Sequence, residues 1–235
     1  MNDDKAIVKK RAIGMKSGVV SQQVSAWAGI AAPIIFTALV IIESLLRPGY
    51  SQIYNNVSDL GAGSYAIIQN VNFIVFGILS IVFALGLGVN LPATREKAAK
   101  CVVWLVAIFG LGVMFAGVTL LFIGVFPEDY VWAAHGLASV VAFFTIVAAQ
   151  LLTWQARRYS EGVTWGRYPA YSLVSGLLSL ILLLVFSYTS STVYHGATER
   201  MFIAVPWIWI AVTGIKLNSL TKAKQPHEEV PIADN

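Results

Sequence analysis

The chain has 235 residues, of which 57% are hydrophobic and only 12% are charged, and its mean hydropathy is +0.71. Soluble domains usually carry about 25% charged residues, so this composition excludes a water-soluble protein and predicts an integral membrane protein. The formal charge of +4 does not indicate nucleic-acid binding, because the basic residues form short clusters beside apolar runs. The single cysteine, Cys101, excludes an intramolecular disulfide and a cysteine-based zinc site.

The first 23 residues form a basic segment that resembles the start of a secretory signal peptide. The apolar run that follows, 24–46, is about twice as long as the apolar part of such a signal. The sequence Arg47-Pro48-Gly49-Tyr50 also lacks the small residues of a cleavage site. We therefore expect the segment 1–23 to be cytoplasmic and the run to be retained as the first membrane span.

Six stretches are long enough to cross a bilayer, for which a helix needs about 20 apolar residues. They are 24–46, 66–89, 101–126, 131–154, 168–189 and 197–217. None shows the alternation of a barrel strand, so the sequence predicts an all-α, polytopic membrane protein built as a bundle of six transmembrane helices over 24–217. The polar segment 218–235, which contains Pro226 and Pro231, is expected to be a disordered cytoplasmic tail.

The basic residues predict the direction in which the chain is threaded. The N-terminal segment contains five of them, and the second connection, the fourth connection and the C-terminal segment contain three each. With six spans, fourteen of the sixteen Lys and Arg residues fall on one side, which the positive-inside rule identifies as cytoplasmic. We therefore expect a multi-pass protein of the cell membrane with both termini in the cytoplasm.

Small residues recur at helical spacing in two spans. Such stripes allow transmembrane helices to approach closely, so the sequence predicts packing faces here rather than a ligand groove. The residues are Gly77, Ser80 and Ala84 in the second span, and Ser172, Ser175, Gly176 and Ser179 in the fifth.

The same threading places the remaining ionisable groups near the opposite, outer face. A proton or ion pathway normally needs ionisable groups at depth, so their restriction to the outer ends argues against ion-coupled transport. The outer face is thus the expected place for any chemistry. The groups are Glu43, Arg47, Asp59, Glu128, Asp129, His135, His195, Glu199 and Arg200.

We divide the outer residues into three sets of candidates. The candidate catalytic residues are Asp59, Asp129, His135 and Glu199. The candidate ligand-binding residues are Glu43, Tyr50, Ser58 and Arg200. The candidate metal ligands are His135 and His195.

Structural roles are open for several of these candidates. Glu43 and Arg47 are four residues apart on one helix face, where they could form an interfacial ion pair. Asp59 could cap the second span, and Asp129 could cap the fourth. His135 is harder to explain structurally, because a histidine below the interface needs a polar partner and often faces a cavity.

Three chemistries are compatible with these residues. Two histidines with a carboxylate could hold a zinc-like ion that activates water for hydrolysis. Alternatively, His135 with Asp59 or Asp129 could act as a metal-free acid–base pair. Ligation of one haem by His135 and His195 is a third and weaker possibility.

The order of motifs resembles the prokaryotic six-span family catalogued as domain of unknown function 998. The resemblance rests on Arg47-Pro-Gly-Tyr-Ser, Val57-Ser-Asp-Leu-Gly-Ala, Gly124-Val-Phe-Pro-Glu-Asp129, His135 in span four, and Gly196-Ala-Thr-Glu-Arg200. It covers nearly the whole chain and implies the six-span fold and a membrane location, while it leaves the activity open.

A more distant resemblance is to the membrane hydrolases that include alkaline ceramidases and adiponectin receptors. That resemblance implies a zinc site of one Ser, one Asp and three His, to which Ser58, Asp59, His135 and His195 would correspond. The chain departs from that pattern, with six spans instead of seven and no third membrane-associated histidine, whose place Glu199 would take.

Two functions therefore remain open from the sequence. The first is a membrane-embedded, hydrolase-like enzyme that acts on a lipid or lipid-linked substrate at the outer face. The second is a non-catalytic membrane protein that binds a lipid or another ligand, or that serves as a subunit of a membrane complex.

Overall fold

The computed structural model describes residues 2–89, 96–157 and 165–223, which form six long helices and the short 3-10 helix η1 (Val57–Gly61). The long helices are α1 (Asn2–Leu46), α2 (Ala66–Val89), α3 (Glu96–Leu120), α4 (Glu128–Arg157), α5 (Tyr168–Thr189) and α6 (His195–Ala223). Each contains a segment long and apolar enough to cross a membrane, and these ranges contain no β-strand element. The predicted all-α, six-span fold is confirmed.

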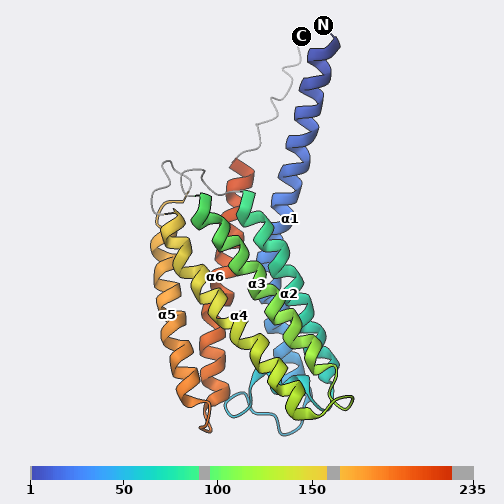
Figure 1. Ribbon diagram of the computed structural model, residues 1–235, viewed down its shortest axis with the longest axis vertical. Helices are drawn as coiled ribbons and strands as arrows, with labels where there is room; N and C mark the ends of the chain where they lie inside the picture. The colour runs from blue at the N-terminus through green and yellow to red at the C-terminus, as the bar shows by residue number, and fades with distance from the viewer. Residues whose placement is uncertain (1, 90–95, 158–164, 224–235) are drawn as a thin grey trace, which may run out of the picture.

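The helices form a closed ring in which each one packs against the next along the chain and α6 returns to pack against α1 (Figure 1). The start of α1 and the end of α6 lie at the same end of the bundle, which we call the terminal end (Figure 1). The opposite end, the loop end, carries the connections 47–65, 121–127 and 190–194. An even number of spans has this consequence, since each crossing reverses the direction of the chain.

The helix boundaries differ most from those predicted at three places. The helix α1 already begins at Asn2, within the N-terminal basic segment. The helix α6 extends beyond 217 to Ala223, and the rest of the predicted tail lies outside the described residues. The helix α3 ends at Leu120 although the apolar run continues to 126, because the chain turns at Gly124, whose φ of +85° favours glycine.

Four aromatic side chains from four helices form the centre of the bundle. Trp207 of α6 stacks on Phe76 of α2 at 4.7 Å between ring centroids. Phe36 of α1 meets Trp207 at 5.4 Å, and Phe109 of α3 meets it at 6.3 Å. Each of these rings is at least 90% buried, so they form an apolar layer that separates the loop end from the terminal end.

The small-residue stripes pack as predicted. A Cβ at Gly77 would lie 2.4 Å from the carbonyl oxygen of Gly110, so α2 and α3 touch backbone to backbone there. In α5, the Ser172 hydroxyl donates to the carbonyl of Gln150 at 2.8 Å and accepts from the Trp209 indole at 2.9 Å. These contacts join α5 to both α4 and α6.

Candidate functional site beneath the interhelical cover

The connection between α1 and α2 folds over the loop end and is held against the first turn of α6 (Figure 1). The backbone N–H of Ala197 donates to the carbonyl of Ile53 at 3.0 Å. A Cβ at Gly196 would lie 2.2 Å from the carbonyl oxygen of Asn55, so only glycine allows this approach. We call residues 50–61 the cover.

Arg200 is the main side-chain anchor of the cover. Its Nη1 donates to the carbonyls of Asn55 and Gly196, at 2.7 and 2.8 Å, and its Nη2 donates to the hydroxyl of Tyr50. That hydroxyl in turn donates to the carbonyl of Asn56 at 2.8 Å. Burial raises the pKa of Tyr50 to about 12, although the positive charge of Arg200 opposes the shift. The Tyr50 hydroxyl therefore stays neutral at physiological pH and keeps its proton for this hydrogen bond.

Asp59 stabilises the cover itself. Its Oδ2 accepts a hydrogen bond from the backbone N–H of Asn56 at 2.8 Å, so the carboxyl group caps η1 and not α2, which begins at Ala66. The guanidinium of Arg47 donates to the backbone carbonyl of Asp59. Asp59 is thus committed to the local fold of the cover.

A cavity of about 40 Å³ lies directly beneath the cover and above the central aromatic layer. A cavity needs about 10–15 Å³ to hold one water molecule, so this one has room for a few. Its lining is mostly apolar, with polar side chains from the cover, α4 and α6. The residues are Phe36, Val57, Ser58, Phe73, Val113, Ala116, His135, Ser139, Ala142, Phe143, Glu199, Ile203 and Trp207.

His135 has the geometry of a positioned base. Its ring is 6% exposed, and its Nδ1 lies 2.9 Å from the carbonyl oxygen of Ala116. Because a carbonyl can only accept, Nδ1 carries a proton, and in the neutral ring Nε2 keeps its lone pair. The Ser139 hydroxyl lies 3.4 Å from Nε2. The rings of Phe73 and Trp132 contact the imidazole edge-on at 6.0 and 5.6 Å, which fixes its orientation.

Glu199 brings a carboxyl group to the same cavity. It is 7% exposed, and its Oε2 accepts the backbone N–H of Val57 at 2.6 Å. One residue therefore both lines the cavity and fastens the cover, next to the anchor Arg200 in the sequence. Ser58 completes the polar lining from the cover side. Of the predicted candidates, the structure thus brings His135, Glu199 and Ser58 together.

Glu43 lies elsewhere, between α1 and α2. Its carboxyl group is fully buried beside the backbone of Gln69 without a well-formed hydrogen bond. Arg47, the expected partner at i+4, is turned toward the carbonyl of Asp59. Glu43 does not line the cavity beneath the cover.

Two further candidates also lie outside the cavity. His195 is the first residue of α6, and its Nδ1 lies 2.6 Å from the carbonyl oxygen of Thr192 in the preceding turn. Asp129 is exposed in the first turn of α4, where its negative charge interacts favourably with the positive end of the helix dipole. Neither side chain reaches the lining of the cavity.

The donor set does not fit a zinc or haem centre. A catalytic zinc takes three protein ligands, and the described residues contain no group of three His, Cys, Asp or Glu side chains placed to hold a metal ion. His135 lines the cavity, whereas His195 does not and lies against the turn before α6, so the two histidines do not share one haem site. The groups available for chemistry in the cavity are therefore His135 and the other polar lining side chains, Ser58, Ser139 and Glu199.

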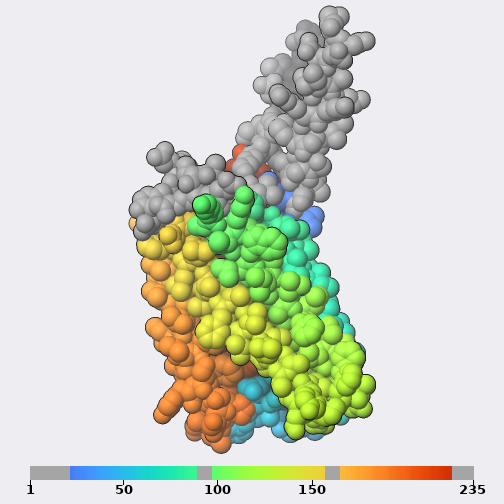
Figure 2. Space-filling view, viewed as in Figure 1, coloured from blue at the N-terminus to red at the C-terminus, as the bar shows by residue number. Residues whose placement is uncertain are grey.

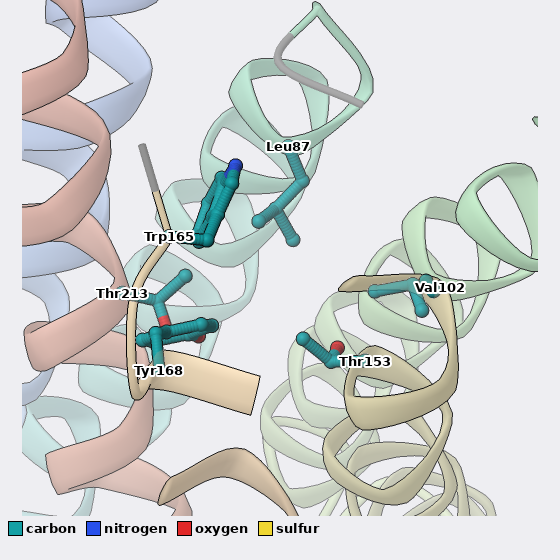
Figure 3. Close-up of a pocket in the computed structure, with 7 residues that line it drawn as sticks. Leu87, Val102, Thr153, Trp165, Tyr168 and Thr213 are labelled. Atoms are coloured by element: carbon teal, nitrogen blue, oxygen red, sulfur yellow. The ribbon is translucent and has the colours of Figure 1, made fainter. Parts of the chain in front are cut away.

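A second recess lies at the terminal end, between α2, α3, α4, α5 and α6 (Figure 3). Its wall includes Trp165 and the adjacent side chains Tyr168 and Thr213, which share a hydrogen bond. The recess has no space for a water molecule and its lining is almost entirely apolar. It is a packing feature and not a candidate site.

Ser139 and the Ala116 carbonyl are functional groups that the sequence did not identify as candidates. Ser139 follows His135 by four residues, the spacing that places two side chains on one helix face. That spacing is a signal in the sequence, although it does not show that the face is turned toward a cavity. The Ala116 carbonyl gives no sequence signal, because any residue supplies a carbonyl.

The fold and the site define a class: a six-span membrane protein with a covered, mostly apolar cavity at its loop end that contains a histidine. The chain belongs to the family described as proteins of unknown function, DUF998, whose sequence profile matches residues 30–216. The family resemblance read from the motifs is therefore confirmed. No curated protein and no solved structure matches the chain significantly.

Proposed function

We propose that this protein is a membrane-embedded, hydrolase-like enzyme that acts on a lipid or lipid-linked substrate at the loop end of the bundle. The observation that carries the proposal is the environment of His135. One ring nitrogen is fixed by a backbone carbonyl, and the other faces a hydroxyl group beside a cavity with room for water. A base held by a third group within reach of a nucleophile is the common arrangement of general-base catalysis.

In the proposed reaction, Nε2 of His135 removes a proton from a water molecule in the cavity. The resulting oxygen nucleophile attacks the electrophilic centre of the substrate, and the leaving group takes the proton back from Nε2 as its bond breaks. Glu199, whose carboxyl group lines the same cavity, stabilises in its ionised form the positive charge that the imidazole carries between these two transfers. Ser139 holds the water near Nε2. Asp59 caps η1 and Asp129 is exposed on α4, and neither lines the cavity, so neither transfers a proton in this scheme.

Replacing His135 tests the proposal. His135→Asn keeps a side-chain N–H that can donate to the Ala116 carbonyl but removes the base, so turnover should fall by about 10²–10⁴-fold. The measurement is mass-spectrometric detection of products after the purified protein, in lipid nanodiscs, is incubated with a panel of phospholipids, acylglycerols, ceramides and polyprenyl-linked lipids.

His195→Asn is the matched control, because it removes a histidine at the same end that does not line the cavity. Its turnover should equal that of the unmodified protein. Equal turnover in the His135 and His195 variants, or no turnover of any lipid by the unmodified protein, would refute the enzymatic proposal.

The proposal also places the loop end on the extracytoplasmic side of the cell membrane. The positive-inside rule supports this orientation, since fourteen basic residues belong to the other side. In a Cys101→Ser background, Tyr130→Cys and Tyr188→Cys at the exposed loop end should react with a membrane-impermeant maleimide on intact cells. Arg167→Cys at the terminal end should react only after the cells are permeabilised. The reverse pattern would overturn the orientation.

One observation favours the non-catalytic alternative, a lipid-binding protein or a subunit of a membrane complex. The cavity of about 40 Å³ has room for water but not for a lipid headgroup, so a lipid substrate can enter only if the cover or the helices around the cavity move. Stoichiometric lipid bound to the purified protein, without any turned-over product, would support this alternative.

A further inference from the structure

The cavity beneath the cover is closed toward the aqueous side. The cover lies over it and is fastened to α6 through Ala197, Glu199 and Arg200. Arg47 adds a contact from the end of α1 to the cover. A substrate that approached from the water would have to displace all of these contacts together.

The side that faces the bilayer is less closed. The helices α4 and α6 separate toward the loop end, and in Figure 2 the cyan cover is visible between α4 and the loop-side ends of α5 and α6. Three cavity-lining side chains on this side, Ser139 and Phe143 of α4 and Ile203 of α6, are half-buried, so they reach the surface of the bundle at positions within membrane spans. The cavity therefore borders a recess at bilayer depth.

One face of α4 forms a wall of this recess. Trp132, Gly136, Ser139 and Phe143 follow one another at helical spacing, and all four are half-buried. A Cβ at Gly136 would have no neighbour within 4 Å, so there is open space beside that glycine. The wall thus has a gap at the residue that directly follows His135, about one turn before Ser139.

The recess changes from polar to apolar with depth. His135, Ser139 and Glu199 lie toward the loop end. Two turns deeper, about 12 Å along the helix from His135, Phe143 closes the recess with Phe202 at 4.8 Å and Phe186 at 6.3 Å between ring centroids. A polar end above an aromatic floor matches an amphiphile that has a headgroup above a hydrocarbon chain.

We propose that the substrate is a bilayer lipid of the loop-end leaflet that enters sideways between α4 and α6. This inference rests on the proposed function and adds the substrate class and its route. Once the cover or the helices around the cavity have moved to admit the lipid, the junction of headgroup and chain lies beside His135 and Ser139, and the first part of the chain lies against Phe143. Water-soluble substrates are excluded from this route, because the mouth of the recess opens into the bilayer.

The test uses a phosphatidylglycerol that carries a diazirine near the carbonyl end of one acyl chain, in nanodiscs with the full chain. After illumination, peptide mass spectrometry should find adducts on the α4 face at Trp132, Ser139 and Phe143. Adducts around Val174, on the exposed face of α5, measure general contact with lipid. The ratio of α4 to α5 adducts is the quantity compared between variants.

Gly136→Trp should fill the mouth and lower that ratio by about tenfold or more, which corresponds to 1.4 kcal/mol or more. Gly136→Ala is the matched control and should leave the ratio unchanged, since its methyl group meets only open space. If the tryptophan variant does not purify as a monodisperse protein, Gly136→Leu replaces it. An equal ratio in all variants, or no α4 adducts above the α5 level, would overturn the proposal.

The two proposals fail separately in these experiments. Adducts that depend on Gly136, without any turnover, would support the lateral lipid route and refute the enzymatic proposal. Turnover of a lipid that depends on His135, without α4 adducts above the α5 level, would support the enzymatic proposal and refute the lateral route.

Discussion

Gly77→Ala should destabilise the folded protein by about 1–3 kcal/mol, the usual effect of forcing additional atoms into a packed interior. The new methyl group would lie 2.4 Å from the carbonyl oxygen of Gly110 and 2.7 Å from the backbone nitrogen of Met114. Backbone atoms cannot rotate out of the way, so α2 and α3 must move apart. The measurement is the midpoint of thermal denaturation in detergent, followed by circular dichroism.

Gly88→Ala in the same helix is the control. There the nearest atom is a methyl group of Val103 at 3.5 Å, an ordinary contact. Alanine is favoured over glycine inside a helix by about 1 kcal/mol, so this variant should equal or exceed the unmodified protein in stability. Equal midpoints for the two variants would show that the Gly77–Gly110 contact does not determine how closely α2 and α3 pack.

Arg200→Met should release the cover. The substitution removes hydrogen bonds from the guanidinium to the Asn55 carbonyl and to the Tyr50 hydroxyl, and it leaves a buried carbonyl without its donor. Hydrogen bonds to charged groups contribute about 1.5–3 kcal/mol each, so opening of the cover should become easier by roughly that amount or more. Amide hydrogen exchange in residues 51–57 should accelerate by about tenfold or more.

Arg167→Met is the control for loss of a positive charge. Arg167 is exposed at the start of α5, at the opposite end of the bundle. Its variant should leave exchange in the cover unchanged. If exchange in 51–57 is also unchanged in Arg200→Met, the cover is held by Glu199 and the backbone contacts of α6, and Arg200 is not its anchor.

The fold was predictable because each membrane-spanning helix requires a long apolar run, which can be recognised directly in the amino-acid sequence. Apolar runs of about 20 residues are required to cross the bilayer, so six of them predict six helices. The boundaries were less certain. The third apolar run continues to Phe126, but the helix α3 ends at Leu120. Hydropathy does not distinguish apolar residues of a turn from those of a helix, and the turn is visible only in the conformation of Gly124.

The candidate site was predictable only in part. His135 stood out because a buried histidine needs a partner, and the structure supplies the Ala116 carbonyl and Ser139. His195 was predicted as a metal ligand, and its Nδ1 lies against the carbonyl oxygen of Thr192 in the preceding turn. Asp59 looked like a base or a helix cap for α2, and it caps η1. Residue type and spacing do not distinguish these cases, because the role of each side chain depends on which hydrogen-bond partner the folded chain places beside it.

Six spans, their small-residue packing faces and the end of the bundle that carries the polar groups could all be predicted from the amino-acid sequence alone. Hydropathy and charge act locally, on each segment and its flanks, so they can be read without knowing the neighbours. The tertiary structure is needed to see that the cover folds over the bundle, and that Glu199 fastens the cover while it lines the same cavity as His135. Val57 and Glu199 are 142 residues apart in the chain, and nothing local in either segment specifies that they meet.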